Sequence, residues 1–509
     1  MKDQDMSSNS PLSFGERLAM LAAERGTSIG LVYLAADGTE TRYSWRDMDG
    51  MVNRYARVLA AHGVKQGDVV AFALKNSPAH IFTVLGIWRL GATTMGFDPK
   101  VPEATKTALL ARVEARLCIQ ENAQAGFLDR ARLEALAQRE SDAAVPNMVS
   151  HPGKILMSGG STGLPKLMAD DQPYLRIPGR TWGNVAPALG FRTDQVNLTC
   201  AAMSHNAPLT WTQNGIFEGN TTILMERFDA LGVIRAVDRY KVGFLLTVPT
   251  MLVRMLDVWP GSGASFASLH ALYHTAAPCP AWLKQAWMDI LGPERVFEMY
   301  GSGESTGQTV ITGPEWLEHR GSVGRGFETQ IRIRDEAGTI LGPHQVGEVF
   351  MRPDDLSGRS RYLGKDAPQP RRDADGFQSV GDAGWLDEDG YLYLTGRRDD
   401  VINSGGHKIP PERVEAALLR HPDIVDATVF GVDDRDWGQA AMALVTRREG
   451  ADPLVPEQVL AFLRQHLEPS DLPKVLREEP NLPRDGFGKI RRKALQAQEN
   501  ARLSAAGKA

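Results

Sequence analysis

The sequence predicts an α/β protein with a large N-terminal domain of several layered α/β subdomains, followed by a small α+β domain. Short apolar runs alternate with amphipathic stretches through the N-terminal half of the chain, which is typical of strand–helix–strand layering. At 509 residues, the chain is also longer than one hydrophobic core usually supports. Two or more domains are therefore expected.

The first well-marked element is a helix expected over residues 44–62. Ser44 and Asp47 have capping-box spacing, apolar residues recur on one helical face, and Gly63 is a natural helix end. Further elements are expected in this order: a strand over 69–74, a helix over 78–90, and a polar surface helix and loop over 122–150.

Four later apolar strands each end in a loop of small or polar residues. Open α/β sheets bind ligands at the C-terminal ends of their strands, so we expect the functional residues in these loops. The strands are expected over 198–203, 242–248, 272–274 and 296–299, and a helix is expected over 227–240.

The pattern changes after Gly313. Residues 329–334 and 348–352 alternate apolar and polar side chains, which predicts a small antiparallel region, and 353–376 is expected to be a loop. We place a domain boundary between 1–398 and 399–509, at a charged tetrad. Beyond it we expect helices over 410–421 and 456–467 and strands over 426–432 and 440–446.

Composition and charge exclude several classes of protein. A net charge of −5 gives no broad electrostatic attraction to nucleic acid or anionic membranes. The three cysteines are far apart, which argues against a disulfide framework or a structural zinc site. The N-terminus has no signal-peptide apolar core, the C-terminus is not a peroxisomal tripeptide, and no apolar run is long enough to span a membrane. These features predict a cytoplasmic protein, and they leave open whether it forms a homo-oligomer.

The segment Ser158–Lys166 is the most informative stretch. It follows a short apolar strand and contains three glycines, three hydroxyl side chains and a lysine. Such a loop can turn its backbone N–H groups around an anion, which favours a polyphosphate ligand. Two alternatives remain: a surface turn, and a hydrolase nucleophile elbow with Ser161 as nucleophile. The residues expected to contact phosphate are Ser158, Gly160, Ser161, Thr162, Gly163 and Lys166.

This loop resembles the phosphate loop of the adenylate-forming superfamily, which contains acyl- and aryl-CoA synthetases, peptide-synthetase adenylation domains and luciferases. The chain departs from the usual pattern at Gly159, where serine is common, and at Leu167, where glycine is common. Four further motifs match in the expected order between about residue 14 and residue 496. The resemblance implies ATP, Mg²⁺ and coenzyme A as cofactors or co-substrates.

Two motifs are similar to the family's nucleotide-binding turns. By resemblance, the run Met299, Tyr300, Gly301, Ser302, Gly303 stacks on adenine and approaches the α-phosphate, and Glu304 holds the magnesium ion. Gly303 stands where threonine is usual, which removes one hydroxyl contact unless a neighbouring serine replaces it. The small residues Ala276, Ala277 and Pro278 resemble the turn beside adenine.

The remaining residues come from the C-terminal part and from one strand end. By resemblance, Asp382 and Arg397 bind the ribose, Asp399 is a hinge to a mobile C-terminal domain, and Lys489 stabilises charge during adenylation. Gly405 and Gly406 resemble the border of the pantetheine tunnel, and His205 resembles the residue that gates the acyl pocket.

The resemblance therefore implies an acyl-CoA synthetase, which joins ATP and a carboxylic acid into an acyl-adenylate and then transfers the acyl group to the CoA thiol. The segment Ala201–Thr212 contains no aspartate that could pair with a substrate amine, which favours an acid without an α-amino group. Small residues around Ala201–Ala207 and Gly301–Gly307 predict a wide pocket for a bulky hydrophobic acid, such as a bile-acid-like or terpenoid-like polycycle. The alternatives are a medium-chain or aryl acid, and a carrier-protein thiol as the acceptor.

Overall fold

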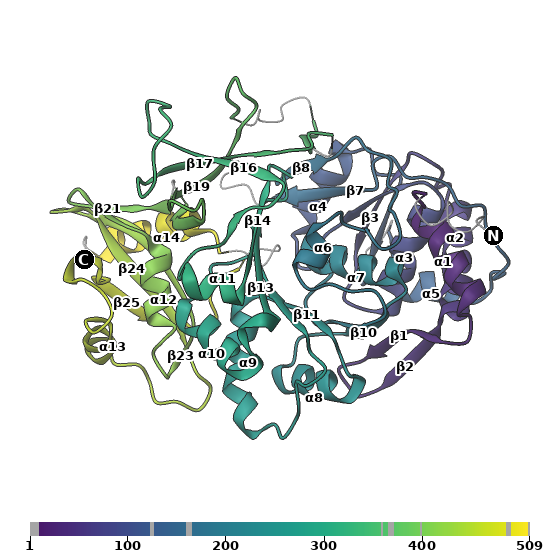
Figure 1. Ribbon diagram of the computed structural model, residues 1–509, viewed down its shortest axis with the longest axis horizontal. Helices are drawn as coiled ribbons and strands as arrows, with labels where there is room; N and C mark the ends of the chain where they lie inside the picture. The colour runs from purple at the N-terminus through teal and green to yellow at the C-terminus, as the bar shows by residue number, and fades with distance from the viewer. Residues whose placement is uncertain are drawn as a thin grey trace.

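The computed structural model describes residues 10–122, 127–158, 165–357, 360–364, 371–397, 400–484 and 490–506. Within these ranges the strands form four sheets. Two large sheets and their helices make up the N-terminal part, and a five-stranded sheet lies at the opposite end of the molecule from α1 and α2 (Figure 1). A four-stranded antiparallel sheet lies between them in the sequence. This arrangement confirms the predicted fold class.

The largest sheet has nine strands in the order β15-β14-β13-β12-β11-β9-β10-β1-β2. Its central strands are parallel, so their C-terminal ends share one edge. Its strands are β1 (Ile29–Leu34), β2 (Glu40–Ser44), β9 (Val196–Thr199), β10 (Thr221–Met225), β11 (Phe244–Thr247), β12 (Ala271–His274), β13 (Val296–Gly301), β14 (Gln308–Thr312) and β15 (Arg325–Gly326).

The second large sheet has seven strands in the order β18-β8-β7-β4-β3-β5-β6. Its parallel strands also end at one edge, and β7 leads into the predicted phosphate loop. Its strands are β3 (Val69–Ala73), β4 (Thr93–Gly96), β5 (Leu117–Gln120), β6 (Leu128–Asp129), β7 (Lys154–Ser158), β8 (Lys166–Ala169) and β18 (Arg361–Tyr362).

Helices cover these sheets because each has an apolar face. In α2, Ser44 and Asp47 form the predicted capping box, and Met48, Val52 and Leu59 are buried. Helix α7 is buried over most of its length and packs against β9, β10 and α1. The helices of the N-terminal part are α1 (Phe14–Glu24), α2 (Trp45–Ala61), α3 (Pro78–Arg89), α4 (Glu103–Arg112), α5 (Arg130–Ala137), α6 (Val185–Ala188), α7 (Asn206–Glu218), α8 (Ala230–Tyr240), α9 (Pro249–Val258), α10 (Ala281–Leu291) and α11 (Gly313–Glu318), with 3-10 turns at Trp259–Gly261 and Pro293–Arg295.

The four-stranded sheet is antiparallel, as the alternation of its residues predicts. Its strands are β16 (Thr329–Arg334), β17 (Gly347–Pro353), β19 (Gln378–Leu386) and β20 (Leu392–Arg397). The segment after residue 400 builds its own apolar core on a five-stranded sheet. It contains β21 (Ile402–Ser404), β22 (His407–Ile409), α12 (Pro411–Leu418), β23 (Ile424–Asp434), β24 (Gly438–Arg447), α13 (Pro456–Leu463), a 3-10 turn (Pro469–Asp471), β25 (Val475–Glu478) and α14 (Arg492–Ala506).

Most expected elements lie within a few residues of their predicted bounds, and two expectations were wrong. The strand expected over 198–203 is β9, which ends at Thr199, so residues after it form the turn leading to α7. The loop expected over 353–376 contains β18, which pairs with β8 through Arg361 and Tyr362. Two residues carry no alternation signal, so only the partner strand reveals this strand. The domain boundary at 398/399 stays a prediction.

Among the described residues, no helix has both the length and the apolar character needed to cross a membrane.

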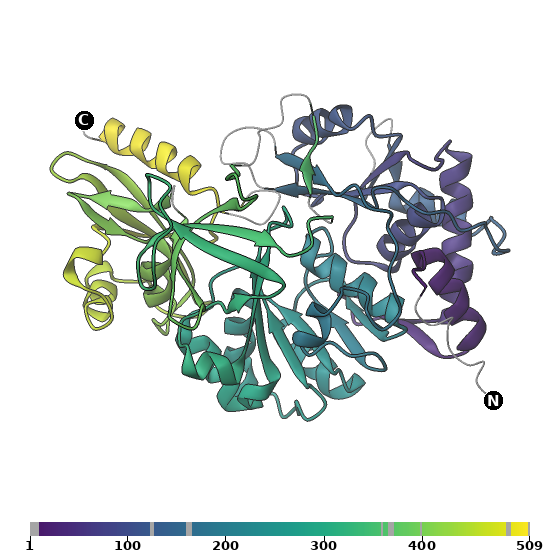
Figure 2. The same cartoon turned by 45° about the horizontal axis from the view of Figure 1, so that its top comes forward.

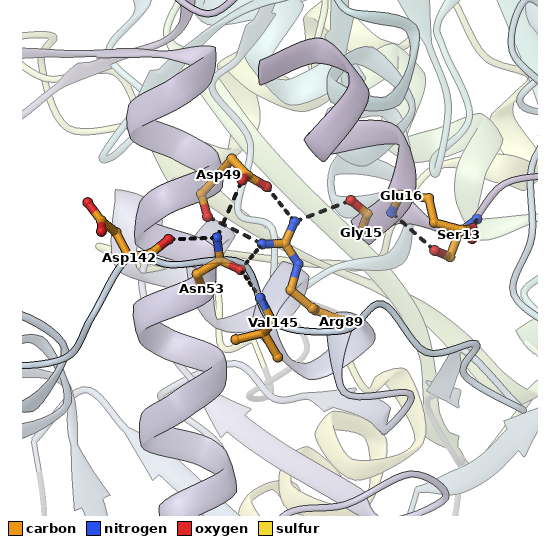
Figure 3. A network of polar contacts seen from close by, with 8 residues as sticks. All are labelled: Ser13, Gly15, Glu16, Asp49, Asn53, Arg89, Asp142 and Val145. Carbon is orange, nitrogen blue, oxygen red and sulfur yellow. Dashed lines mark hydrogen bonds and ion pairs between the residues drawn. The ribbon is translucent and has the colours of Figure 1, made fainter. Parts of the chain in front are cut away.

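A buried arginine ties the N-terminal helices together (Figure 3). The Arg89 side chain is 1% exposed and pairs with Asp49 at 2.6 Å. Its guanidinium also donates to Asn53 Oδ1 at 2.6 Å and to Gly15 O at 3.2 Å. These bonds join α1, α2 and α3 through a single side chain, so the charge is both paired and hydrogen-bonded.

Replacing Arg89 with leucine should therefore destabilise the chain by about 3 kcal/mol or more, because it leaves the Asp49 carboxylate without its ion-pair partner and removes one of the donors to Asn53 Oδ1. The measurement is the free energy of unfolding from urea denaturation. Arg54→Leu is the matched control: Arg54 follows Asn53 on α2, is 29% exposed and pairs with Asp142 at 3.5 Å. That change should cost less than about 1 kcal/mol. Equal losses would contradict a special role for Arg89.

Candidate functional site

The predicted phosphate and nucleotide segments meet at the C-terminal edges of the two large sheets. Ser158 ends β7, and its Cα partner across the antiparallel pair is Lys166, the first residue of β8. The turn Ser302–Glu304 follows β13 and approaches β8, because a Cβ on Gly303 would lie 3.6 Å from Met168 Cε. Gly160, Ser161, Thr162, Gly163, Asp399 and Lys489 lie outside the described residues.

The turn after β12 is open on one side. Thr275 is buried and its hydroxyl donates to Met299 O at 2.8 Å, which joins the ends of β12 and β13. Ala276 has φ 75°, a left-handed conformation that is uncommon for a residue with a side chain. Ala276, Ala277 and Pro278 are exposed. The turn therefore leaves small side chains and backbone exposed, as contact with a flat ligand requires.

Tyr300 connects the nine-stranded sheet to the four-stranded sheet. Its hydroxyl donates to Asp382 Oδ2, and Arg397 Nε lies 3.4 Å from the other carboxylate oxygen. Asp382 and Arg397 are also Cα partners between β19 and β20. Burial, followed by the negative charge of Asp382, raises the pKa of Tyr300 well above its ordinary value, so the phenol stays a proton donor. Three residues from distant segments thus form one polar group.

The turn between Gly301 and Gly307 is held by its own side chains. Ser302 and Thr306 hydroxyls are 2.8 Å apart, and Ser305 has φ 53°. Gly301 and Gly303 are exposed. A Cβ on Gly301 would lie 3.2 Å from Gly307 O, so a glycine allows the turn to close.

Glu304 has a partner that the sequence did not indicate. The Tyr362 hydroxyl donates to Glu304 Oε1 at 3.1 Å, and Lys166 Nζ lies 5.1 Å from the centroid of the same ring. Tyr362 lies in β18, inside the segment expected to be a loop. The described residues contain no group of three or more metal-ligating side chains. Glu304 therefore fits a magnesium ion only in the usual way for a nucleotide site, as one carboxylate that acts together with phosphate oxygens.

The residue expected to gate the acyl pocket lies at the start of α7. His205 is half-buried at the N-cap of α7, and its carbonyl accepts from Leu209 N–H at 3.2 Å. Trp211 on the same helix packs against Trp182 at 5.1 Å and against Tyr273 at 5.2 Å between ring centroids. The aromatic cluster consists of Trp182, Phe191, Trp211, Phe244 and Tyr273.

This aromatic cluster corrects the argument for a wide pocket. Ala201 and Ala207 are small, but both pack in the cluster with Trp211 and Phe244. A cavity lined by Ala201, Trp211 and Phe244 runs beside them. The volume beside a small residue is thus taken up by large residues from other elements, so small side chains in one segment do not by themselves leave a wide space.

Gly405 and Gly406 form the turn between β21 and β22, with φ 58° and 90°. Gly405 N–H donates to Trp437 O at 2.8 Å. Among the described residues, no hydrogen bond or ion pair joins this turn to Tyr300, Glu304 or Asp382, so the structure does not bring these two glycines together with the cleft residues.

Comparisons with known proteins agree with this geometry. Residues 21–357 match the family described as AMP-binding enzyme, and residues 413–489 match the AMP-binding enzyme C-terminal domain. A 2-succinylbenzoate–CoA ligase of Bacillus pumilus is 28% identical over 90% of this chain and 94% of its own length. A feruloyl-CoA synthase of Amycolatopsis is 30% identical over 88% of this chain and 92% of its own length.

Solved structures share the fold. The o-succinylbenzoate CoA synthetase of Bacillus subtilis, in complex with its acyl-adenylate, has a TM-score of 0.79 and 22% identity, covering 96% of this chain and 98% of its own. An anthranilate CoA ligase, in complex with anthranoyl-AMP, has a TM-score of 0.77 and 20% identity, covering 99% and 100%.

Two carboxylates, Asp382 on β19 and Asp387 in the turn after it, are expected to respond in opposite ways to replacement by asparagine. Burial raises the pKa of Asp382. A raised pKa means that the folded state binds the proton more tightly than the unfolded state does. Ionisation of Asp382 therefore lowers the stability of the fold, and this loss develops as pH rises from the unfolded pKa of about 3.9 through the folded pKa. Asp382→Asn should therefore stabilise the chain at pH 7, and this gain should shrink toward pH 3.5.

Asp387 is the matched comparison. Burial alone would raise the pKa of Asp387, but bonds from Tyr391 N–H and His319 lower it, so its charge adds stability that is lost as pH falls through the folded pKa. Asp387→Asn should cost about 1–3 kcal/mol at pH 7. Thermal denaturation between pH 3.5 and 8 measures both variants. A loss of stability in Asp382→Asn at pH 7 would contradict the inference that burial raises the pKa of Asp382.

Proposed function

Because the chain belongs to the AMP-binding enzyme family, we propose that it is an AMP-forming CoA ligase that activates an aryl carboxylic acid. The observation that carries the proposal is the convergence of Tyr300, Asp382 and Glu304 with Lys166 at the edges of two sheets. A nucleotide that lies against the turn at Ala276 would place its ribose near Asp382 and its phosphates near Lys166 and Glu304.

The residues divide the first step between them. Tyr300 and the small turn at Ala276–Pro278 hold the adenine, and Asp382 offers two acceptor oxygens to the vicinal ribose hydroxyls. Lys166 and the phosphate loop bind the phosphates. Magnesium, when bound at Glu304, neutralises phosphate charge. A substrate carboxylate oxygen then attacks the α-phosphorus, the bond to pyrophosphate breaks, and the acyl-adenylate forms.

In the second step the thiol of CoA, after losing its proton, attacks the acyl carbon. The carbon–sulfur bond forms, the bond to the AMP oxygen breaks, and AMP leaves. Gly405 and Gly406 are proposed to border the pantetheine during this step. His205, at the start of α7, is proposed to lie between the acyl group and the entering thiol, and Asp399 is proposed as the hinge of the small domain.

The aryl acid replaces a polycyclic acid as the favoured substrate for two reasons. The aromatic cluster around Trp211 offers flat faces and a narrow space, on which an aromatic ring packs better than a fused polycycle. The relatives also act, by name, on succinylbenzoate and ferulate. Family membership favours adenylation over the hydrolase alternative for Ser161.

The direct test is pyrophosphate release with a panel of aryl, medium-chain and polycyclic acids, each with and without CoA. We expect ATP-dependent release with aryl acids and thioester formation only when CoA is present. Turnover that is highest with a polycyclic acid would contradict the aryl assignment. Adenylation without transfer to CoA would favour a carrier-protein acceptor.

The aromatic cluster gives a second prediction. Trp211→Leu should lower kcat/KM for the preferred aryl acid about tenfold, because a pocket distinguishes groups of this size by about 1–3 kcal/mol, and should raise it for a bulkier acid. Trp259→Leu is the control, because Trp259 packs on Phe266 in a different cluster. The acid panel measures both variants. If Trp211→Leu ranks the acids by kcat/KM as the wild type does, the acyl group does not bind beside Trp211.

Lys489 is proposed to serve adenylation only. Lys489→Ala should slow pyrophosphate release about 100-fold, the usual cost of one charge-stabilising contact, while thioester formation from supplied acyl-adenylate stays near the wild-type rate. The two half-reactions are measured separately. Equal losses of rate in the two half-reactions would contradict the proposal that Lys489 serves adenylation only.

A further inference from the structure

Tyr362 contacts two candidate site residues, but neither the sequence motifs nor the proposed function assigns it a role. It belongs to β18, which reaches the seven-stranded sheet from a segment far along the chain. Tyr362 is the Cα partner of Met168 in β8, and Leu363 N–H donates to Leu167 O at 2.8 Å. Figure 2 shows the green strand β18 beside the blue strands of that sheet. This pairing fixes the tyrosine backbone beside the strand that begins at Lys166.

The Tyr362 side chain touches two oppositely charged residues at once. Its hydroxyl donates to Glu304 Oε1 at 3.1 Å, and Lys166 Nζ lies 5.1 Å from its ring centroid. Burial, followed by the charge of Glu304, raises the pKa of Tyr362, so the phenol keeps its proton at neutral pH and remains a donor. The ring thus faces a cation while its hydroxyl faces an anion, which suits the charge distribution of a phenol.

The position of the ring also keeps the two charges apart. Lys166 and Glu304 come from segments that lie in contact, since Gly303 lies against Met168. Yet no ion pair between Lys166 and Glu304 is present among the described residues; both instead contact Tyr362. A direct pair would satisfy each charge with the other, and neither would then be free for a phosphate or a metal ion.

We propose that Tyr362 is a positioning residue that orients the Glu304 carboxylate for magnesium and prevents Glu304 from pairing with Lys166. This inference rests on the proposed function, because it takes Glu304 as the metal ligand and Lys166 as a phosphate ligand. The chemical class that the arrangement recognises is a divalent cation bound to a nucleoside triphosphate.

Two variants separate the two parts of this role. Tyr362→Phe keeps the ring and removes the hydroxyl, so metal affinity should fall about tenfold or more, as when a hydrogen bond to a metal-binding carboxylate is lost. Nucleotide affinity without metal should stay unchanged. Tyr362→Leu also removes the ring, so Lys166 can pair with Glu304, and nucleotide affinity should fall as well.

Binding, not turnover, is the first measurement. Electron paramagnetic resonance reports free Mn²⁺ during titration of the full chain with Mn²⁺ and a non-hydrolysable ATP analogue, and calorimetry gives the affinity for the analogue without metal. Tyr391→Phe is the matched control, because the Tyr391 hydroxyl also donates to a glutamate, Glu315, at 3.1 Å, with Arg325 5.7 Å from its ring centroid. This control should bind Mn²⁺ and the analogue as the wild type does.

A double-mutant cycle tests whether Tyr362 acts through Glu304. In a Glu304→Gln background, Tyr362→Phe should cause no further loss of Mn²⁺ affinity. The proposal is overturned if Tyr362→Phe binds Mn²⁺ like the wild type, if Tyr391→Phe loses as much, or if the losses from Tyr362 and Glu304 simply add.

The same titrations separate failure of the Tyr362 proposal from failure of the proposed function. A wild-type chain that binds the Mn²⁺–analogue complex but releases no pyrophosphate with any acid would refute the ligase activity and leave the Tyr362 result valid. A wild-type chain that binds neither metal nor analogue would overturn both proposals.

Discussion

The hydrogen bond from Tyr300 to Asp382 is the interaction on which the site depends. It joins β13 of the nine-stranded sheet to β19 of the four-stranded sheet, and the register of β19 with β20 places Arg397 against the same carboxylate. Other contacts also join these two sheets, among them the bond from Gln308 N–H on β14 to Thr329 Oγ1 on β16 and the bridge between Arg325 and Tyr391. The Tyr300–Asp382 bond is distinctive among these contacts because it is charge-assisted and joins two candidate site residues directly.

A buried ion pair stabilises the same strand, β13, from the helix that packs on it. Lys284 on α10 donates to Glu298 on β13, and both side chains are buried. Glu298 is the Cα partner of His274, the last residue of β12, and burial lowers the pKa of His274 to about 4, so its ring is neutral. The pair anchors α10 to β13, the strand that contains Tyr300, beside the strand that leads into the Ala276 turn. The charges are compensated, which avoids the large cost of an isolated buried ion.

In the proposed function, each sheet edge contacts a different part of one ligand. Parallel strands deliver their loops to a common edge, and the two large sheets bring two such edges together. The antiparallel sheet adds residues that no parallel strand supplies, among them Asp382 and Arg397. The aromatic cluster contacts the end of β13, since the Tyr273 hydroxyl lies 4.0 Å from Met299 Sδ; in the proposed function this contact connects the nucleotide side to the acyl side.

The sequence by itself determined the fold class, the order of most elements and the placement of several candidate residues at strand ends, because hydrophobic period, capping and glycine turns act over a few neighbouring residues. Ser44 and Asp47, or the turn at Tyr300, could be recognised without any partner. Only the tertiary structure decided what surrounds those residues. Tyr362 lies in a two-residue strand whose pairing is with residues nearly two hundred positions earlier, and Trp211 fills the space beside Ala201. Both depend on contacts between distant segments, and side-chain packing of that kind leaves no periodic signal in the sequence.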